Sequence, residues 1–183
     1  MLIGIDEVGR GALAGPLVVA CVSLKNSIEG LRDSKKLTIK KRIDFYSKIF
    51  INSNLVSLGW VWPHEIDRYG LTKSMEIAIL RALNNLKIDS NVQIILDGNV
   101  NYLKDKDFNV RTMIKADDLI NEVSAASIIA KVTRDNYMKE LAKYYPLYNF
   151  NQNVGYGTKD HLSAIRKIGP TQIHRSLFLR KII

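Results

Sequence analysis

The sequence predicts an α/β domain in which helices flank a mixed five-stranded sheet and the C-terminal portion is helical. Three strand-like segments fall in the first third of the chain, and strands and helices then alternate, an order typical of a mixed sheet. The chain has 183 residues and shows no internal repeat, low-complexity tract or linker. We therefore expect a single domain over residues 1–183, with its helical portion beginning at about residue 144.

The first two strands are expected to form an antiparallel hairpin. Met1–Ile5 is apolar and leads directly into Asp6 and Glu7, and the valine-rich segment Leu17–Leu24 follows a glycine-rich turn. A parallel pair would need a longer crossover than this connection provides.

The later elements follow from apolar runs and from apolar residues at helical spacing. Three further strands are expected at Leu55–Trp62, Val92–Leu96 and Val110–Ile114, the last as an edge strand. Four helices are expected over Ile39–Phe50, Met75–Leu86, Leu119–Lys143 and Thr158–Ile168. Thr38 is the expected N-cap of the first helix, and Gly169 with Pro170 ends the last.

Four acidic residues lie where such a sheet would gather them. Asp6 and Glu7 follow the first strand, Asp97 ends the fourth strand, and Asp117 precedes the long helix. If the first and fourth strands are parallel neighbours, their terminal carboxylates converge at one end of the sheet. A regular pleat points adjacent side chains to opposite faces, so we expect the backbone to turn beside Gly9.

Each acid also has a purely structural interpretation. Asp97 with Gly98 is a common turn pair, and Asp117 or Asp118 could cap a helix. Two adjacent acids at the end of an apolar strand are costly unless a cation or bases meet them. Carboxylates without His or Cys suit Mg²⁺ or Mn²⁺, and two such ions roughly 4 Å apart serve in-line phosphodiester cleavage.

The glycine-rich turn differs from a dinucleotide-binding loop. Gly9, Gly11 and Gly15 have the spacing GxGxxxG, and a strand follows them instead of a helix. The turn is better suited to close backbone approach to a sugar or phosphate, with Arg10 as an anion contact.

The net charge of +9 favours a polyanionic partner, either nucleic acid or an anionic membrane surface. A soluble basic surface without such a partner is the alternative. No apolar run is long enough to span a membrane, and no signal peptide is visible. Cys21 is the single cysteine, which excludes an internal disulfide and predicts a buried thiol in a reducing, cytoplasmic setting.

Basic residues form two groups that could contact phosphates, although a solvated helix face is the better interpretation of any single lysine. The first group is Lys35, Lys36, Lys40, Lys41 and Arg42, and the second is Lys159, Arg166, Lys167, Arg175, Arg180 and Lys181. Ser124, Ser127 and Lys131 share one face of the long helix near Asp117. The two serines could merely permit close helix packing.

The ordered motifs resemble those of type 2 ribonuclease H, the bacterial ribonuclease HII family. The resemblance covers nearly the whole chain. It rests on the DExGRG signature at Asp6–Gly11, a DSKKL segment at Asp33–Leu37, a strand-end aspartate in Leu96–Gly98, a K(G/A)D element at Lys115–Asp117, a long-helix signature at Ser124–Asp135, and C-terminal patterns at Gly155–Thr158 with His161 and at Gly169–Thr171 leading to His174-Arg175.

The resemblance implies an endonuclease that cleaves the RNA strand of RNA/DNA hybrids. It also implies nicking of duplex DNA 5′ to an embedded ribonucleotide, giving 5′-phosphate and 3′-hydroxyl ends by two-metal-ion hydrolysis, in support of the removal of misincorporated ribonucleotides. The expected partners are therefore RNA/DNA hybrids and ribonucleotide-containing duplex DNA. We expect a monomer that does not associate with membranes.

The resemblance also assigns residue roles. The acids matching the family's catalytic metal ligands, for two Mn²⁺ or Mg²⁺ ions, are Asp6, Glu7, Asp97 and Asp117. Gly9, Arg10 and Gly11 match the loop that senses the ribose 2′-hydroxyl, the group that distinguishes RNA from DNA. Tyr156 matches the tyrosine that stacks on the deoxyribose after the ribonucleotide. The full set expected to bind substrate is Gly9, Arg10, Gly11, Lys35, Lys36, Ser127, Lys131 and Tyr156.

The chain departs from the family pattern at two places. Asn153-Val154 stands where His-Lys is usual, and Ser176-Leu177 follows Arg175 where Arg-Ser is usual. Both changes remove basic or polar groups from the expected nucleic-acid surface, so we expect them to affect affinity more than chemistry. Ser176–Phe178 faintly resembles a sliding-clamp peptide but lacks its glutamine, and packing of Leu177 and Phe178 is the simpler interpretation.

Two alternatives stay open. Ribonuclease HIII is a sister type with an additional N-terminal substrate-binding domain, for which we expect no room before Asp6. A non-catalytic nucleic-acid-binding protein of the same fold would also match much of the pattern, although the four intact acids argue against it.

Overall fold

The computed structural model describes residues 1–32, 34–86, 88, 91–180 and 182. The predicted mixed five-stranded sheet is confirmed, and its strands lie in the order β3-β2-β1-β4-β5. The strands are β1 Leu2–Val8, β2 Leu17–Leu24, β3 Ser53–Val61, β4 Gln93–Asp97 and β5 Asn109–Met113. Two residues of the motifs and basic groups above, Asp33 and Lys181, lie outside the described residues.

The central strand β1 has different partners along its length. It pairs with β2 in antiparallel register as far as Val8, opposite Val18, so the predicted hairpin is confirmed. It pairs with β4 in parallel register, and the last pair is Ile5 with Leu96. The prediction that β1 ends at Ile5 is wrong, because pairing with β2 continues after β4 has ended.

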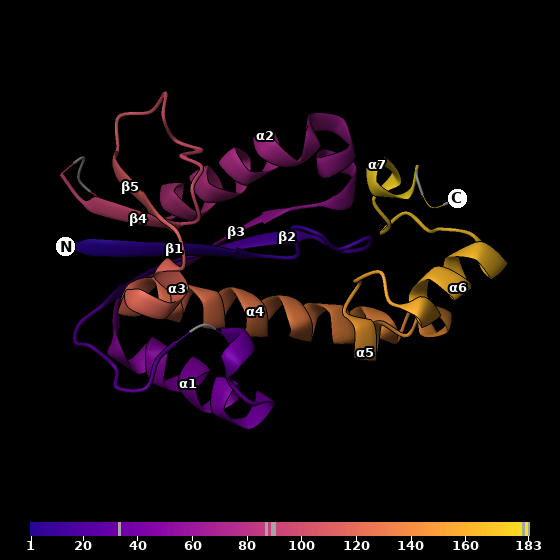
Figure 1. The fold of residues 1–183 in the computed structure, drawn as a ribbon, viewed down its shortest axis with the longest axis horizontal. Coiled ribbons are helices and arrows are strands. Elements are labelled where there is room, and N and C mark those ends of the chain that lie inside the picture. The colour runs from indigo at the N-terminus through magenta and orange to yellow at the C-terminus, as the bar shows by residue number, and fades with distance from the viewer. Residues whose placement is uncertain (33, 87, 89–90, 181, 183) are drawn as a thin grey trace.

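Helices cover both faces of the sheet (Figure 1). One face carries α1 Ile39–Asn52 and α4 Asn121–Ala142, and the other carries α2 Pro63–Asn84. The predicted N-cap of α1 is confirmed, because the Thr38 side chain accepts a hydrogen bond from the Lys41 amide. The helix predicted from Met75 begins twelve residues earlier, at Pro63, and Gly70 with φ of 72° kinks it and obscures its periodicity.

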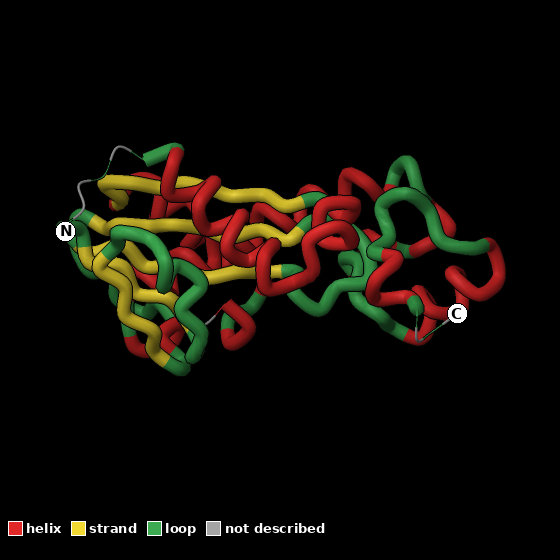
Figure 2. Tube along the Cα trace, turned by 90° about the horizontal axis from the view of Figure 1, so that it is seen from above, coloured by secondary structure: helices red, strands yellow, loops and turns green. Residues whose placement is uncertain are grey.

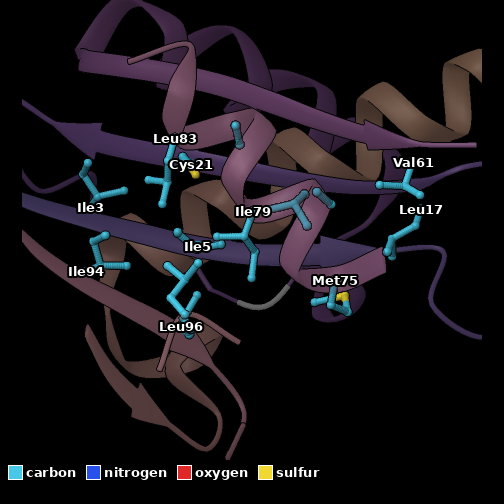
Figure 3. Packing of buried hydrophobic residues seen from close by; sticks show 14 of the residues in the cluster. Ile3, Ile5, Leu17, Cys21, Val61, Met75, Ile79, Leu83, Ile94 and Leu96 are labelled. Carbon is cyan, nitrogen blue, oxygen red and sulfur yellow. The ribbon is translucent and has the colours of Figure 1, made fainter. Parts of the chain in front are cut away.

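Two apolar layers hold the helices to the sheet. On the α2 side, Ile3 and Ile5 of β1 pack with Ile79 and Leu83 of α2 (Figure 3). The Cys21 thiol is fully buried in this layer, as predicted, and burial raises its pKa. On the α4 side, apolar residues of β2 pack against the middle of α4.

Gly4 sets the distance between β1 and α4. A Cβ atom at this position would lie 2.2 Å from the backbone carbonyl carbon of Glu122 and 2.3 Å from the Val123 amide nitrogen. The backbone of α4 therefore leaves no room for any side chain at residue 4, and backbone atoms cannot move aside as a flexible side chain can. The first turn of α4 consequently lies against β1, close to Asp6.

The predicted helical C-terminal portion lies at one end of the elongated molecule (Figure 2). It comprises η2 Pro146–Tyr148, α5 Phe150–Asn153, α6 Lys159–Ile168 and α7 Ser176–Leu179. It has its own apolar cluster, which includes Tyr148, Phe150 and Ile165. Ala14 forms an isolated β-bridge with His174 and thereby joins this portion to the glycine-rich turn. Two short helices, η1 Ser34–Lys36 and α3 Ala116–Leu119, complete the described elements.

None of the helices in the described part of the chain combines the length and the apolar character that crossing a bilayer requires.

Candidate active site

Asp6 and Asp97 come together where β4 ends. Ile5 of β1 pairs with Leu96 of β4, and both side chains belong to the apolar layer on the α2 side. The next residue of each strand is Asp6 or Asp97, so the alternation of side chains turns both carboxylates toward α3 and α4. The predicted convergence of strand-end carboxylates is thus present for this pair.

Asp117 is tied to the same place through the backbone of α3. The Ala116 amide donates to Asp97 Oδ1 at 2.8 Å, so Asp97 holds the first residue of this helix. Asp117 follows Ala116 and is buried, and its carbonyl oxygen accepts a hydrogen bond of 2.7 Å from Ser124 Oγ of α4. Asp117 does not cap α3, because Lys115 is the N-cap residue of this helix.

Glu7 reaches the site although the backbone does not turn. β1 keeps its regular register at Glu7, opposite Val19, so the predicted turn beside Gly9 is wrong at this residue. Because β4 ends at Asp97, no strand flanks Glu7 on that side, and its longer side chain can pass the end of β4. Glu7 and Asp6 line one hollow, and the charge of Asp97 acts on both.

The four acids line two hollows that share Lys35. The first is lined by Asp6 and Glu7 with Val8, Ser34, Lys35, Ser127, Lys131 and Tyr156. The second is lined by Asp97 and Asp117 with Lys35, Lys36, Gly98, Ile114, Lys115 and Asp118. Ser127 Oγ lies 3.0 Å from Ser34 Oγ, and Ser127 opposes the rise in the pKa of Asp6. The structure therefore brings five predicted substrate-contact residues, Lys35, Lys36, Ser127, Lys131 and Tyr156, to the acids.

Burial and mutual repulsion make the charged form of these acids costly. Burial raises the pKa of Asp6 well above its usual value, and the charges of Glu7 and Asp97 raise it further. Burial also raises the pKa of Glu7, with Arg10 and Lys35 opposing the shift. A hard divalent cation would relieve this cost, and carboxylate oxygens are the ligands it prefers. Among the described residues, no three acidic, histidine or cysteine side chains already form a complete metal-ligand cluster.

The glycine-rich turn lies against Tyr156. The Gly9 amide donates to Tyr156 Oη at 3.2 Å, so the phenol hydrogen stays available for another acceptor. Gly9 has φ of 85°, and a Cβ atom there would lie 2.2 Å from Arg134 Nε. Arg10 is half-exposed and lies 3.7 Å from Glu7, whereas a Cβ at Gly11 would meet open space. Gly9 thus has a backbone reason to be glycine, whereas nothing in the structure around Gly11 requires one.

Two cations flank the Tyr156 ring. Lys131 Nζ lies 5.9 Å from the ring centroid and forms an ion pair of 2.9 Å with Asp135. The Arg134 guanidinium lies 5.4 Å from the same centroid. The ring therefore lies near two basic groups, and it lines the same hollow as Asp6 and Glu7.

Two buried arginines shape the glycine-rich turn, and neither was predicted to do so. Arg134 is fully buried, and its guanidinium donates to the carbonyls of Pro16 at 2.8 Å, Val154 at 2.9 Å and Ala14 at 3.1 Å. Arg175, equally buried, donates to the carbonyls of Gly15 at 2.8 Å and 3.0 Å and of Arg10 at 3.1 Å.

The interpretation of Arg175 as a phosphate contact is therefore wrong. Sequence spacing does not distinguish an arginine that faces solvent from one that faces free carbonyls. The glycine-rich turn could have indicated the buried arginine, because it has few donors of its own to pair with its carbonyls. Burial lowers the pKa of Arg175 to about 9. The other described members of its group, Lys159, Arg166, Lys167 and Arg180, are exposed.

The first basic group is only partly available to a ligand. Lys36 Nζ pairs with Asp118 Oδ2 at 2.5 Å, and Arg42 donates to the carbonyls of Ser34 at 3.0 Å and Leu37 at 3.1 Å. Lys40 and Lys41 are exposed on α1. Lys35 is the member that lines both hollows.

The first departure from the family pattern lies in a packed loop, whereas the second begins at the exposed Ser176. Asn153 is buried, donates to the Tyr148 carbonyl at 2.7 Å and accepts from the Gly155 amide at 2.8 Å. It therefore shapes the loop before Tyr156 and is not itself an exposed group. Phe178 packs against two apolar clusters, in agreement with the simpler interpretation of the C-terminal segment.

Comparisons with known proteins agree with this geometry. The family model described as Ribonuclease HII matches residues 3–181. Ribonuclease HII of Caldicellulosiruptor bescii is 42% identical over 98% of this chain and 87% of its own length. Ribonuclease HII of Campylobacter concisus is 46% identical over 97% of this chain and 92% of its own.

Solved structures show the same fold. The ribonuclease H2 of Pyrococcus horikoshii superposes with a TM-score of 0.80 at 30% identity, covering 99% of this chain and 96% of that one. The ribonuclease HII in a PCNA complex from Archaeoglobus fulgidus gives a TM-score of 0.81 at 25% identity, covering 96% and 92%. The chain belongs to the ribonuclease HII family, a family of ribonuclease H-type endonucleases.

Proposed function

We propose that this protein cleaves the RNA strand of RNA/DNA hybrids and nicks duplex DNA 5′ to an embedded ribonucleotide. The observation that carries the proposal is the meeting of Asp6 and Asp97 beyond the end of β4, with Asp117 fixed beside them by the Asp97–Ala116 hydrogen bond. A phosphodiester that enters this end of the sheet would meet four carboxylates and Lys35.

Asp6, Glu7, Asp97 and Asp117 would hold two divalent ions, Mg²⁺ or Mn²⁺. Their donor set is purely oxygen, and burial together with the neighbouring carboxylates raises the pKa values of Asp6 and Glu7, a cost that bound cations would relieve. When bound, such ions supply an activated water and stabilise the leaving 3′-oxygen in an in-line displacement. Asp97 would also position Asp117, because it accepts a hydrogen bond from the Ala116 amide at the start of α3.

The substrate would be oriented by residues on both sides of the acids. Lys35 and Lys131 lie in the hollow of Asp6 and would contact phosphates, with Ser127 keeping Asp6 oriented. Gly9, Arg10 and Gly11 would approach the ribose 2′-hydroxyl, since the turn is close to Glu7 and carries little side-chain bulk. Tyr156 would stack on the deoxyribose after the ribonucleotide.

The decisive experiment uses a DNA duplex with one ribonucleotide, incubated with the protein and Mg²⁺ or Mn²⁺. We expect a single nick on the 5′ side of the ribonucleotide, leaving 3′-hydroxyl and 5′-phosphate ends. The matched variant Asp6→Asn should not nick it, and Asp44→Asn on the exposed face of α1 should nick it like the unmodified protein. Equal nicking by Asp6→Asn would overturn the catalytic proposal in favour of a site elsewhere. Binding without any nick would favour the non-catalytic alternative.

A sliding clamp is a second candidate partner, since the Archaeoglobus fulgidus structure above is a complex with PCNA. In this chain the Asp67 carboxylate accepts hydrogen bonds from the amides of Ser176 at 2.9 Å and Leu177 at 2.8 Å. A clamp that used this segment would therefore have to release α7 from α2. Pull-down with the clamp should be lost when Ser176–Ile183 is deleted, and an unchanged pull-down would contradict binding through this segment.

A further inference from the structure

His161 and His174 form a buried pair that the chemistry above does not use. His161 lies in α6 and His174 precedes α7, and neither ring is more than 3% exposed. Their Nε2 atoms are 3.1 Å apart, which is hydrogen-bonding distance. One ring must therefore donate to the other.

The remaining ring nitrogens determine the direction of that bond. The Thr171 amide donates to His174 Nδ1 at 3.0 Å, so this nitrogen carries no hydrogen and His174 is protonated on Nε2. His174 Nε2 then donates to His161 Nε2, which leaves the hydrogen of His161 on Nδ1. His161 Nδ1 lies 2.8 Å from the Tyr156 carbonyl oxygen and donates to it. A single arrangement with two neutral rings satisfies every contact.

A third proton would break one of these contacts. On His161 Nε2 it would face the hydrogen of His174, and on His174 Nδ1 it would displace the hydrogen of the Thr171 amide, with Thr171 Oγ1 at 3.0 Å as its acceptor. The ring centroids of Tyr148 and His174 are 4.8 Å apart, those of Phe150 and His161 are 5.3 Å apart, and these aromatic rings exclude water from the pair. Burial lowers the pKa of both histidines, that of His174 to about 4.

The charged and titratable neighbours are engaged elsewhere. The Arg175 guanidinium, next in the chain to His174, is directed to the carbonyls of Gly15 and Arg10. Arg134 of α4 donates to the backbone carbonyls of Pro16, Val154 and Ala14, and Tyr148 Oη donates to the Gly169 carbonyl at 2.6 Å. The strongest partners of the two rings are thus each other, Thr171 and Tyr156.

We propose that His161 and His174 are positioning residues for Tyr156, acting as a pair that is neutral in both rings. Gly9 fixes the hydroxyl end of Tyr156, and the pair fixes its backbone end. The inference rests on the proposed role of Tyr156 in reading the junction between RNA and DNA. Loss of the pair should therefore reduce preference for the junction, while the four acids remain in place.

The first test measures the pair without any substrate. Long-range ¹H–¹⁵N NMR spectra at pH 7 should show His161 with its hydrogen on Nδ1 and His174 with its hydrogen on Nε2, and His64→Gln removes the third histidine signal for assignment. Neither ring should gain a proton between pH 8 and pH 5.5. A charged ring at pH 7, or the opposite tautomers, would overturn the proposal.

The second test compares two variants at one position. His174→Gln keeps an N–H that can donate toward His161, whereas His174→Leu has none. For His174→Leu we expect the ratio of kcat/KM on the single-ribonucleotide duplex to kcat/KM on an all-RNA/DNA hybrid to fall roughly tenfold, because a small misplacement of a contact is costly. His174→Gln should recover much of the ratio, and the exposed-site control His64→Gln should leave it unchanged.

Coupling to Tyr156 separates positioning from general loss of structure. In a Tyr156→Ala background, His174→Leu should not lower the ratio further, since the contact it positions is already gone. A further fall, or an equal loss on both substrates with the ratio intact, would contradict the proposal. An unmodified protein that cleaves neither substrate would contradict the proposed function instead, and the NMR measurement would still decide the state of the pair.

Discussion

The two sides of the candidate site differ in how their polar and charged groups are compensated. The acid side, around Asp6, Glu7 and Asp97, gathers like charges that burial already penalises. The side around Tyr156 contains two buried arginines and two neutral histidines whose polar atoms bond to backbone groups and to one another. The acid side therefore gains by binding a cation, whereas the Tyr156 side is already organised without a ligand. Substitutions should separate the two behaviours.

The largest expected effect is a divergence of activity and stability at Asp6. We expect Asp6→Asn to lower kcat by about 10³-fold or more, since it removes one of the four carboxylates proposed to bind the metal ions. The same variant should have a higher melting temperature at pH 8 in the presence of chelator, because it removes a charge that burial and Glu7 destabilise. Single-turnover kinetics check the loss of activity, and thermal unfolding checks the gain in stability. A lower melting temperature would contradict this account of the acid side.

On the other side, Arg134→Met should be strongly destabilising. It removes three hydrogen bonds to buried carbonyls, and the free energy of unfolding should fall by about 3–5 kcal/mol in urea titration. Arg166→Met on the exposed face of α6 is the matched control and should change it by less than about 0.5 kcal/mol. Similar small values for both would show that the carbonyls of the turn find water when Arg134 is absent.

A smaller effect should follow from acidification. The pKa of His174 in the folded state, about 4, lies below its ordinary value of 6.5, so the unfolded chain binds more protons between these pH values. The contribution of His174 is therefore fully present above pH 6.5 and is lost as the pH falls toward 4. We expect it to amount to about 2–3 kcal/mol, measured as the difference in pH dependence between the unmodified protein and His174→Gln. Parallel curves for the two proteins would contradict the assignment.

The smallest effect is expected at the hydroxyl of Tyr156. Tyr156→Phe removes the acceptor of the Gly9 amide but keeps the ring that Lys131 and Arg134 approach. We expect a loss of about 1 kcal/mol, or roughly fivefold in kcat/KM, on the single-ribonucleotide duplex. Tyr144→Phe, on an exposed tyrosine of the C-terminal portion, is the control. A loss as large as that of Tyr156→Ala would assign the hydroxyl a direct contact with substrate.

Much of this arrangement follows from local sequence patterns. The strand that ends in Asp97, the hairpin around Gly9 and the cap at Thr38 each depend on a few neighbouring residues, and the structure confirms them. The end of β1 could not be predicted in this way, because it depends on β2 continuing to pair after β4 stops.

Burial by parts of the chain that are distant in sequence also could not be predicted from local patterns. Arg175 stands among exposed basic residues in the sequence, but its surroundings come from Arg10 and Gly15. Asn153 differs, since it bonds to Tyr148 and Gly155 within its own loop. Periodicity describes the face of an element but not the carbonyls that a distant loop brings to it, so Arg175 was predicted to contact phosphate.

The carbonyl contacts of Arg175 also affect when the protein can become complete during synthesis. The guanidinium bonds to Gly15, which precedes it by 160 residues, and Arg134 bonds to Pro16 across 118 residues. All four acids are translated by residue 117, yet the turn beside them has both arginine donors only after Arg175 has left the ribosome. A nascent chain therefore carries all four acids well before the glycine-rich turn can be held in its final shape.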